Sequence, residues 1–197
     1  MVTTKVPTAV ADIASQSEAE AGTATDKFMT PETTKQAIAA LSLTLGTPQA
    51  TTSGTAFDFT SIPSGTKRIT LSYSSVSTNG TSGLLCQIGD SGGIETTGYI
   101  GAVVRLTNNN VTASTVGFRL NQASDAAQTQ RGSLVLTLID AATFTWVATA
   151  SNADSLASVV NFGASEKALS AELDRIRFTT VNGTDAFDAG KVNILYE

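Results

Sequence analysis

The sequence predicts a mostly β protein: an antiparallel β-sandwich of the jelly-roll kind, with a short helical arm before it. Three observations support this. The 197-residue chain holds 31 Thr and 20 Ser, residue types that favour strands and turns. From about residue 50, short segments alternate apolar and polar residues between turn signals. The helix signals lie in the first 47 residues. We therefore predict an arm over 1–47 and a β-sandwich domain over 48–197.

The arm carries signals for two short helices. Residues 12–21 are rich in Ala, Glu, Ser and Gln, and Gly22 follows where a helix commonly ends. Thr30 then precedes Pro31, the pattern of an N-cap followed by proline, and Glu32 suits the positive end of a helix. The second helix is predicted over residues 31–43. Helices of this length are marginal alone, so the arm packs on the larger domain, another copy or a partner. The alternative is a partly ordered arm.

Ten segments of the larger domain have the alternation and length of strands. They are residues 55–60, 68–76, 84–88, 99–106, 115–120, 133–139, 144–149, 159–162, 174–180 and 191–196. Turn signals separate them at residues 63–65, 79–80, 90–93, 108–110 and 182–183. This number and spacing of strands is typical of a two-sheet antiparallel domain.

Large residues on one face of each strand predict the core. The predicted members are Ile69, Leu71 and Tyr73; Leu134, Leu136 and Leu138; Phe144 and Trp146; Ile176 and Phe178; and Val192, Ile194 and Tyr196. Cys86 lies between Leu85 and Gln87 in a strand, and we predict a buried free thiol.

Composition argues against several functional classes. The chain has no His and one Cys, which argues against histidine catalysis, a disulfide framework and a cysteine-rich zinc site. A net charge of −5 and a pI near 4.7 argue against nucleic-acid binding. The sequence contains neither an apolar stretch of the roughly 20 residues that cross a bilayer nor the apolar region of a signal peptide. We therefore expect no membrane insertion, and synthesis in a cytoplasm.

Motifs that could carry chemistry have simpler structural readings. Four acidic residues near the C-terminus could form a glycosidase pair or hold a cation: Asp174, Asp185, Asp188 and Glu197. Turn and surface roles are the preferred interpretation, because Asp in turn-like sequence bonds its own backbone. The Gly-containing segments 90–93 and 188–191 lack phosphate-loop spacing and read as hairpin turns. We predict no catalytic residue, no cofactor and no metal.

Two groups of residues resemble a known family. Residues 14–22 read ASQSEAEAG, residues 26–31 read DKFMTP and residues 36–38 read QAI. This pattern resembles a segment common in phage tail-fibre and related virion proteins, A-x-x-x-E-A-x-A-G followed by K-x-M-T-P and a short helix. Residues 59–70, 76–82, 87–89, 93–99, 173–177 and 182–197 are similar to a β domain at the C-terminus of phage fibre and appendage proteins.

The resemblance implies a virion structural protein, assembled as a homotrimer, made in the host bacterial cytoplasm and located in the virion. Its implied partners are other copies, other tail or capsid proteins and a host-surface polysaccharide. The chain departs from long tail fibres in one respect, because no shaft repeats separate the arm from the β domain. A short fibre, a tail-tip adaptor and a capsid-mounted fibre all fit this better than a long shafted fibre. The first hypothesis is a short tail fibre or tail-tip protein for host-surface recognition. The alternatives are a capsid-mounted head fibre, decoration or adaptor protein without a receptor role, and, ranked lowest, an enzyme that cuts host polysaccharide.

The same interpretation suggests contact residues for two roles, attachment to the virion and recognition of a receptor. Phe28, Met29, Ile38 and Leu41 are the candidates for virion attachment or trimer contact. Tyr99, Asn108, Asn109 and Asn110 are the candidates for receptor contact. An aromatic ring could stack on a sugar, but alternation places Trp146 and Tyr73 in the core, which leaves Tyr99 as the least certain of the aromatic residues.

Overall fold

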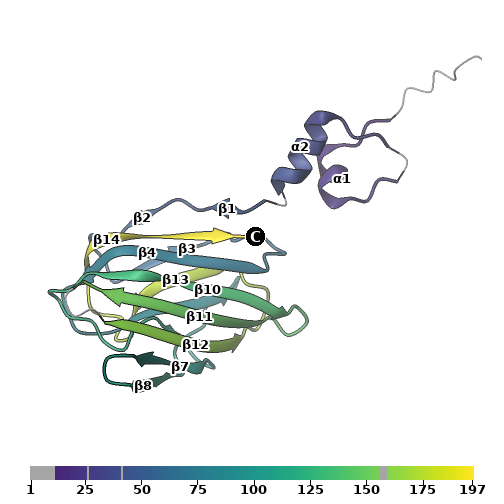
Figure 1. Cartoon of the computed structure of the whole chain (residues 1–197). Coiled ribbons are helices and arrows are strands. Elements are labelled where there is room, and N and C mark those ends of the chain that lie inside the picture. Colours follow the sequence, from purple (N-terminus) through teal and green to yellow (C-terminus); the bar gives the residue numbers. More distant parts are fainter. Residues whose placement is uncertain (1–11, 26, 41, 156–158) are drawn as a thin grey trace, which may run out of the picture. The chain divides into compact units, whose positions relative to one another are not determined.

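The computed structural model describes residues 12–25, 27–40, 42–155 and 159–197 (Figure 1). The chain divides into two compact units, Met1–Leu43 and Thr44–Glu197. The predicted boundary lay at residue 47. The division falls earlier because β1 (Thr44–Leu45) and β2 (Gln49–Ala50) both pair with β14 (Phe187–Tyr196) of the larger unit.

The first unit contains helix α1 (Gln16–Ala21) and helix α2 (Pro31–Ala40). Helix α1 begins later than predicted, because Ser15 caps it in a reciprocal capping box with Glu18. Upstream of this cap, Ile13 instead forms a parallel bridge with Phe28. Gly22 adopts a left-handed conformation with φ of 62° and ends the helix as predicted.

Helix α2 begins at Pro31 as predicted. The Thr30 hydroxyl accepts a hydrogen bond from the Thr33 amide at 3.1 Å, which is the expected cap. The helix ends at Ala40 rather than near residue 43, and the Ser42 amide closes a turn on the Ala39 carbonyl. Within the described residues, no helix is long and apolar enough to cross a membrane.

The second unit is mostly β, and all its strand pairs are antiparallel (Figure 1). Its larger sheet has nine strands in the order β1-β14-β4-β10-β11-β12-β7-β8, with β2 also beside β14. The other strands of this sheet are β4 (Arg68–Thr78), β7 (Ile100–Arg105), β8 (Asn110–Ser114), β10 (Gln130–Asp140), β11 (Thr145–Asp154) and β12 (Val160–Ala168).

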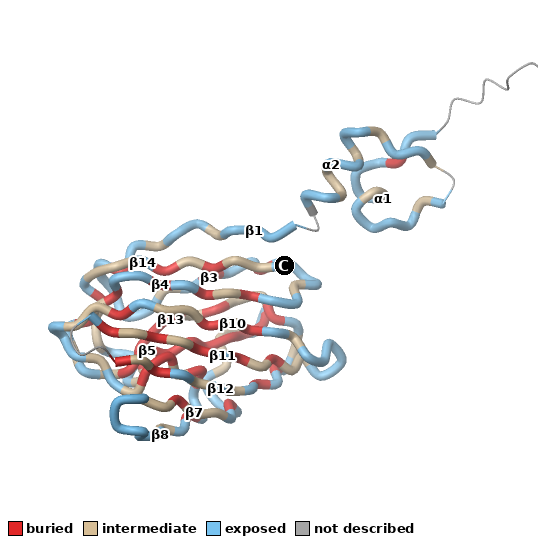
Figure 2. Tube along the Cα trace, in the orientation of Figure 1, coloured by how far each residue is buried: buried red, intermediate tan, exposed pale blue. Residues whose placement is uncertain are grey.

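The smaller sheet has five strands in the order β3-β13-β5-β6, with β9 also beside β5. These are β3 (Ala56–Phe59), β5 (Leu84–Asp90), β6 (Gly93–Ile94), β9 (Phe118–Arg119) and β13 (Arg175–Thr180). The two sheets share one hydrophobic core, and the buried residues gather along their facing strands (Figure 2). Tyr73 of β4 and Phe178 of β13 meet in this core with ring centroids 5.4 Å apart.

The predicted core residues are confirmed with a few adjustments. Ile69, Leu71, Tyr73, Leu134, Leu136, Trp146, Ile176, Phe178, Val192 and Ile194 are buried. Leu138, Phe144 and Tyr196 are half-buried and pack against the same core. Cys86 is buried and free, and burial raises the pKa of its thiol.

Two predicted strands are corrected. Phe144 has a φ of 50° and lies in the turn before β11, so that strand begins at Thr145. In the predicted strand 115–120, only Phe118 and Arg119 pair, because Ser114 closes a tight turn onto the Gly117 carbonyl. Strand β8, which was not predicted, forms a hairpin with β7 around the predicted Asn turn.

Candidate functional site

Apolar side chains lie exposed on the N-terminal unit. Phe28, Met29 and Ile38 are all exposed, Phe28 to 66%. Leu41, the fourth predicted attachment residue, lies outside the described residues. The structure adds Ile13, which is exposed and lies beside Phe28 because the two residues are bridge partners. No periodicity indicated Ile13, since the bridge joins two irregular segments.

The described residues of this unit form almost no interior. Ala14 is the only residue buried among those described from 12 to 39. Polar contacts hold the unit together instead. Lys27 forms an ion pair with Glu18 at 2.8 Å, and the Glu18 carboxylate also accepts a hydrogen bond from the Ser15 amide at 2.9 Å. The hydrogen bond from Lys27, followed by those from Ser15, lowers the pKa of Glu18 to about 2.

The predicted asparagine turn lies at an exposed hairpin tip. Asn108, Asn109 and Asn110 are all exposed between β7 and β8. Asn109 has a φ of 51°, a left-handed conformation that asparagine tolerates. The Asn108 side chain accepts a hydrogen bond from the Asn110 amide at 3.1 Å, which fixes the turn. The structure therefore presents this predicted receptor-contact segment to solvent.

Tyr99, the other predicted receptor contact, is buried, and this prediction is corrected. Only 1% of the residue is exposed. Its hydroxyl accepts from the Ile88 amide and donates to the Glu95 carbonyl, both at 2.9 Å. Its ring packs edge-on against Phe118 with centroids 4.9 Å apart. Tyr99 thus anchors the segment between β6 and β7 to the strand β5.

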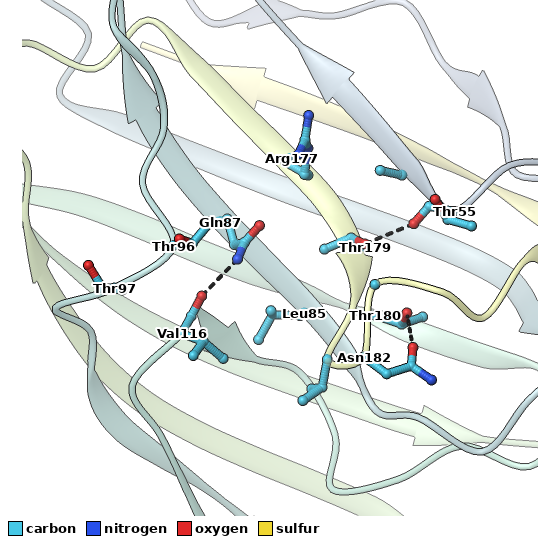
Figure 3. Close-up of a pocket in the computed structure, with 13 residues that line it drawn as sticks. Thr55, Leu85, Gln87, Thr96, Thr97, Val116, Arg177, Thr179, Thr180 and Asn182 are labelled. Atoms are coloured by element: carbon cyan, nitrogen blue, oxygen red, sulfur yellow. Dashed lines mark hydrogen bonds between the residues drawn. The ribbon is translucent and has the colours of Figure 1, made fainter.

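A groove of about 500 Å³ lies against the smaller sheet, lined by residues of β3, β5 and β13 and their neighbouring loops (Figure 3). Leu85 and Gln87 come from β5, and Arg177 and Thr179 from β13. The segments after β6 and β8 and the turn after β13 complete the lining. Those further residues are Thr55, Ala56, Thr96, Thr97, Val116, Thr180, Val181, Asn182 and Gly183.

Hydrogen bonds within the lining fix the shape of the groove (Figure 3). Gln87 donates its side-chain amide to the Val116 carbonyl at 2.8 Å, and Thr179 donates to the Thr55 carbonyl at 2.8 Å. Arg177 makes two 2.8 Å hydrogen bonds to the Asp58 carboxylate on β3. The hydrogen bonding and charge of Asp58 raise the pKa of Arg177, so the guanidinium stays charged.

The groove suits a neutral polar ligand. Thr55, Thr96 and Thr97 are exposed and carry hydroxyl groups that can donate or accept hydrogen bonds. Val116, which is partly exposed, supplies apolar surface beside them, with the buried Leu85 beneath. The alternation of residues 174–180 indicated that Arg177 and Thr179 face away from the core. Nothing in the sequence indicated that Thr96 and Thr97 meet them, because that contact depends on how the loop after β6 folds.

The acidic residues weighed as a catalytic or cation site have separate partners. Asp174 bonds Arg175, and Glu197 bonds Arg68. Asp185 accepts from the Ser82 amide at 2.9 Å, and Asp188 accepts from the Ser77 hydroxyl. Across the described part of the chain, no group of three or more His, Cys, Asp and Glu residues could hold a metal ion. These contacts favour surface roles. One prediction is wrong, because residues 188–191 form an irregularity within β14 and not a hairpin turn, and Asp188 is an exposed residue of that strand.

No protein-family model, curated protein or solved structure matches the chain.

Proposed function

We propose that the chain is a bacteriophage virion structural protein, a short tail fibre or tail-tip protein whose β domain recognises the host surface. The observation that carries this proposal is the difference in burial between the two units. One unit is small, has almost no core among its described residues and exposes Ile13, Phe28, Met29 and Ile38. The other is a large β unit with a complete core. The sequence resemblance to virion fibre proteins runs through both.

The N-terminal unit is the proposed attachment arm. Exposed apolar side chains on a unit that buries so little of its own surface are typical of a segment that completes its core on a partner. We assign Ile13 to this surface together with Phe28, Met29 and Ile38. The partner is another virion protein or the arm of another copy.

The β unit is the proposed recognition domain, a jelly-roll-like sandwich assembled as a homotrimer. The shared core between two antiparallel sheets supports the sandwich. Two surfaces are suited to a polysaccharide: the hydroxyl-lined groove of the smaller sheet and the Asn108–Asn110 tip. Neutral sugars are recognised by hydroxyl and amide groups, and three copies would convert weak contacts into useful avidity.

The second candidate is a capsid-mounted head fibre, decoration or adaptor protein without a receptor role. The observation that favours it is the composition of the groove, whose thirteen lining residues include no aromatic ring on which a sugar could stack. In this case the arm binds the capsid, and the β unit serves only as an outer structural element.

The test is to locate the chain in virions of its source phage. Mass spectrometry of purified virions should detect it, and its absence from them would overturn the proposal. Immunogold labelling with an antibody against residues 48–197 then separates the two candidates. Label at the tail end supports host recognition, whereas label over the head supports the capsid protein.

Binding of the full-length protein to host cells tests the recognition role separately. Thr97→Lys in the groove and Asn109→Asp at the hairpin tip place charges in the two proposed contact surfaces. Ala142→Lys in the exposed turn between β10 and β11 is the matched control. Loss of binding in a surface variant but not in the control supports recognition, and unchanged binding in both surface variants excludes these surfaces.

A further inference from the structure

A row of uncharged side chains crosses the outer face of the nine-stranded sheet. The strand registers place one residue from each of eight consecutive strands side by side, and these side chains face away from the core. In order across the sheet they are Leu45, Leu195, Thr70, Val135, Thr149, Ala164, Ala102 and Ala113. None of them is buried within the chain.

A second uncharged row lies one pleat away. The same registers align Asn193, Ser72, Ser133, Ser151, Phe162, Val104 and Val111. We call the two rows together the uncharged face. None of its fifteen side chains is ionisable, although the outer face of a sheet bounded by water commonly carries charged residues.

The smaller sheet offers an internal comparison. Its outer surface carries the bidentate Arg177–Asp58 ion pair and a second pair between Arg175 and Asp174. Both sheets come from one chain with 15% charged residues. A low content of charge therefore does not by itself explain why one outer face has charges and the other has none over two full rows.

The uncharged face is apolar where β12, β7 and β8 meet. Phe162 is 48% exposed and Val111 63% exposed, and both are in the second row. Both residues line a shallow hollow of about 340 Å³, together with residues that include Ala102, Val104 and Ala164. Exposed apolar residues that adjoin a hollow form a surface into which a partner's side chain can pack.

The size of this face is that of a small protein–protein contact. Eight strands at about 4.8 Å spacing give a width of about 34 Å, and two rows cover about 14 Å along the strands. The flat area is thus about 500 Å². The next row holds Arg68 and Glu166 beside Thr137, Val147 and Ile100, so a charged row borders the uncharged face. Two such faces in contact would bury about 1,000 Å² in total, the lower bound of a specific interface.

We propose that the uncharged face is the contact surface between copies of this chain. The inference deepens the proposed homotrimer, and it rests on the proposed function for the number of copies. The absence of charge on the face fits a second copy as the occupant, because the same face of that copy brings no charge that would be buried unpaired. Each copy carries a net charge of −5, so association is least opposed where both surfaces are uncharged. Phe162, Val111 and the hollow that they line form an apolar area that a second copy can bury.

The first test measures whether this face is covered in the purified full-length protein. The native Cys86 is buried, so an added cysteine is the only accessible thiol. Ala164→Cys places a small thiol within the face, and Ala142→Cys places one in an exposed turn. Coverage by other copies should slow the maleimide reaction of Ala164→Cys by at least about tenfold relative to Ala142→Cys, because thiol reactions depend on access. Equal rates in the native protein overturn the proposal.

The second test disrupts the contact and measures the assembly by sedimentation. Wild-type protein should sediment as an oligomer, and Thr149→Lys combined with Ala164→Glu should shift it to a monomer with an unchanged β-type circular dichroism spectrum. Should the double variant misfold, Thr149→Lys alone, at an exposed position, decides the outcome. A monomeric wild-type protein overturns the proposal. It is also overturned if the face variants fold and stay oligomeric whereas Phe28→Lys makes the protein monomeric, since the contact would then lie in the N-terminal unit.

These outcomes are independent of where the protein resides. A chain absent from virions but oligomeric through this face would refute the proposed function and leave the contact surface standing. If the chain is present in virions but the thiol of Ala164→Cys reacts as fast as the control, the proposed function stands and the contact surface is refuted.

Discussion

Lys167 and Glu95 form an ion pair that is largely removed from solvent and joins β12 to the segment after β6. The Lys167 side chain is 7% exposed and that of Glu95 23%. Ser170 also donates to Glu95, through its amide at 2.8 Å and its hydroxyl at 2.9 Å. Burial opposes ionisation of Glu95, but the hydrogen bonds and charge of Lys167 and Ser170 outweigh it and lower its pKa.

We predict that Glu95→Gln destabilises the protein by about 3 kcal/mol at neutral pH, because it leaves the buried ammonium of Lys167 without its counter-charge. The folded-state pKa of Glu95 lies below its ordinary value of 4.5. Its ionic contribution is therefore present above about pH 4.5 and disappears as pH falls through the lowered value. Urea denaturation across this range should show the difference from wild type narrowing in acid.

The control for this prediction is Glu166→Gln, which changes an exposed carboxylate on the same strand. It should alter the free energy of unfolding by less than about 0.5 kcal/mol. An equal effect of the two substitutions at neutral pH would contradict the role assigned to the Lys167–Glu95 pair.

Tyr99 gives a second prediction for a single side chain. Its buried hydroxyl satisfies the Ile88 amide and the Glu95 carbonyl. Tyr99→Phe keeps the ring but removes both partners, so we expect a loss of about 1–3 kcal/mol in unfolding free energy. Tyr196→Phe, at a half-buried position, should have a smaller effect. Reduced host-cell binding by Tyr99→Phe with unchanged stability would reverse the correction and return Tyr99 to the receptor surface.

Among the structural elements, β14 depends on an irregularity opposite β4. The register shifts between Ala189 and Lys191, where Gly190 has a φ of 97°. A Cβ at Gly190 would lie 2.6 Å from backbone atoms of Ser75 and Val76. Gly183 also has a positive φ, 68°, but a Cβ there would meet nothing within 4 Å. The two glycines therefore separate the effect of backbone conformation from that of crowding.

We predict that Gly183→Ala destabilises by about 1–2 kcal/mol, the usual penalty of a left-handed conformation for a residue with a Cβ. Gly190→Ala should have a larger effect, about 3 kcal/mol or more, because the neighbouring backbone must also move. Thermal and urea unfolding of the two variants measure the difference. Equal destabilisation would show that the backbone of β4 can move away from residue 190 without a measurable loss of unfolding free energy.

Strong alternation made some strands predictable and left others hidden. Residues 68–76 and 133–139 alternate large apolar with polar residues, and both segments form central strands of the larger sheet. Strand β8 reads Asn-Val-Thr-Ala-Ser and lacks that contrast, because it is an edge strand whose partly exposed residues need no apolar face. β1, β2 and β6 contain two residues each, too few for any period to appear.

The candidate surfaces could be predicted where their residues are close together in the sequence. The Asn108–Asn110 tip and the exposed Phe28 follow from turn residues and from a short arm. The groove combines segments that are distant in the sequence, such as Thr55, Thr97 and Arg177, and the uncharged face depends on strand registers that no single segment specifies. Alternation shows which residues of one strand point outward, but not which strands become neighbours.

At the scale of the whole molecule, the two units differ in what stabilises them. The larger unit has a core that both sheets share, whereas the smaller unit depends on caps and on the Lys27–Glu18 ion pair. Surface ion pairs and caps contribute little to global stability compared with a buried core. The free energy of unfolding should therefore reside almost entirely in residues 44–197.

This contrast predicts the outcome of truncation. A fragment of residues 44–197 should unfold at the same urea concentration as the full chain, because it retains every strand of the larger unit. A fragment of residues 52–197 should lose about 3 kcal/mol. It lacks β1, β2 and the buried Thr51, whose amide and hydroxyl bond the Gly190 and Ala189 carbonyls at 3.0 and 2.7 Å, and it exposes the edge of β14. Equal stability of the two fragments would mean that β1 and β2 add nothing to the sheet, whereas a large loss already in the 44–197 fragment would mean that the arm stabilises the β unit.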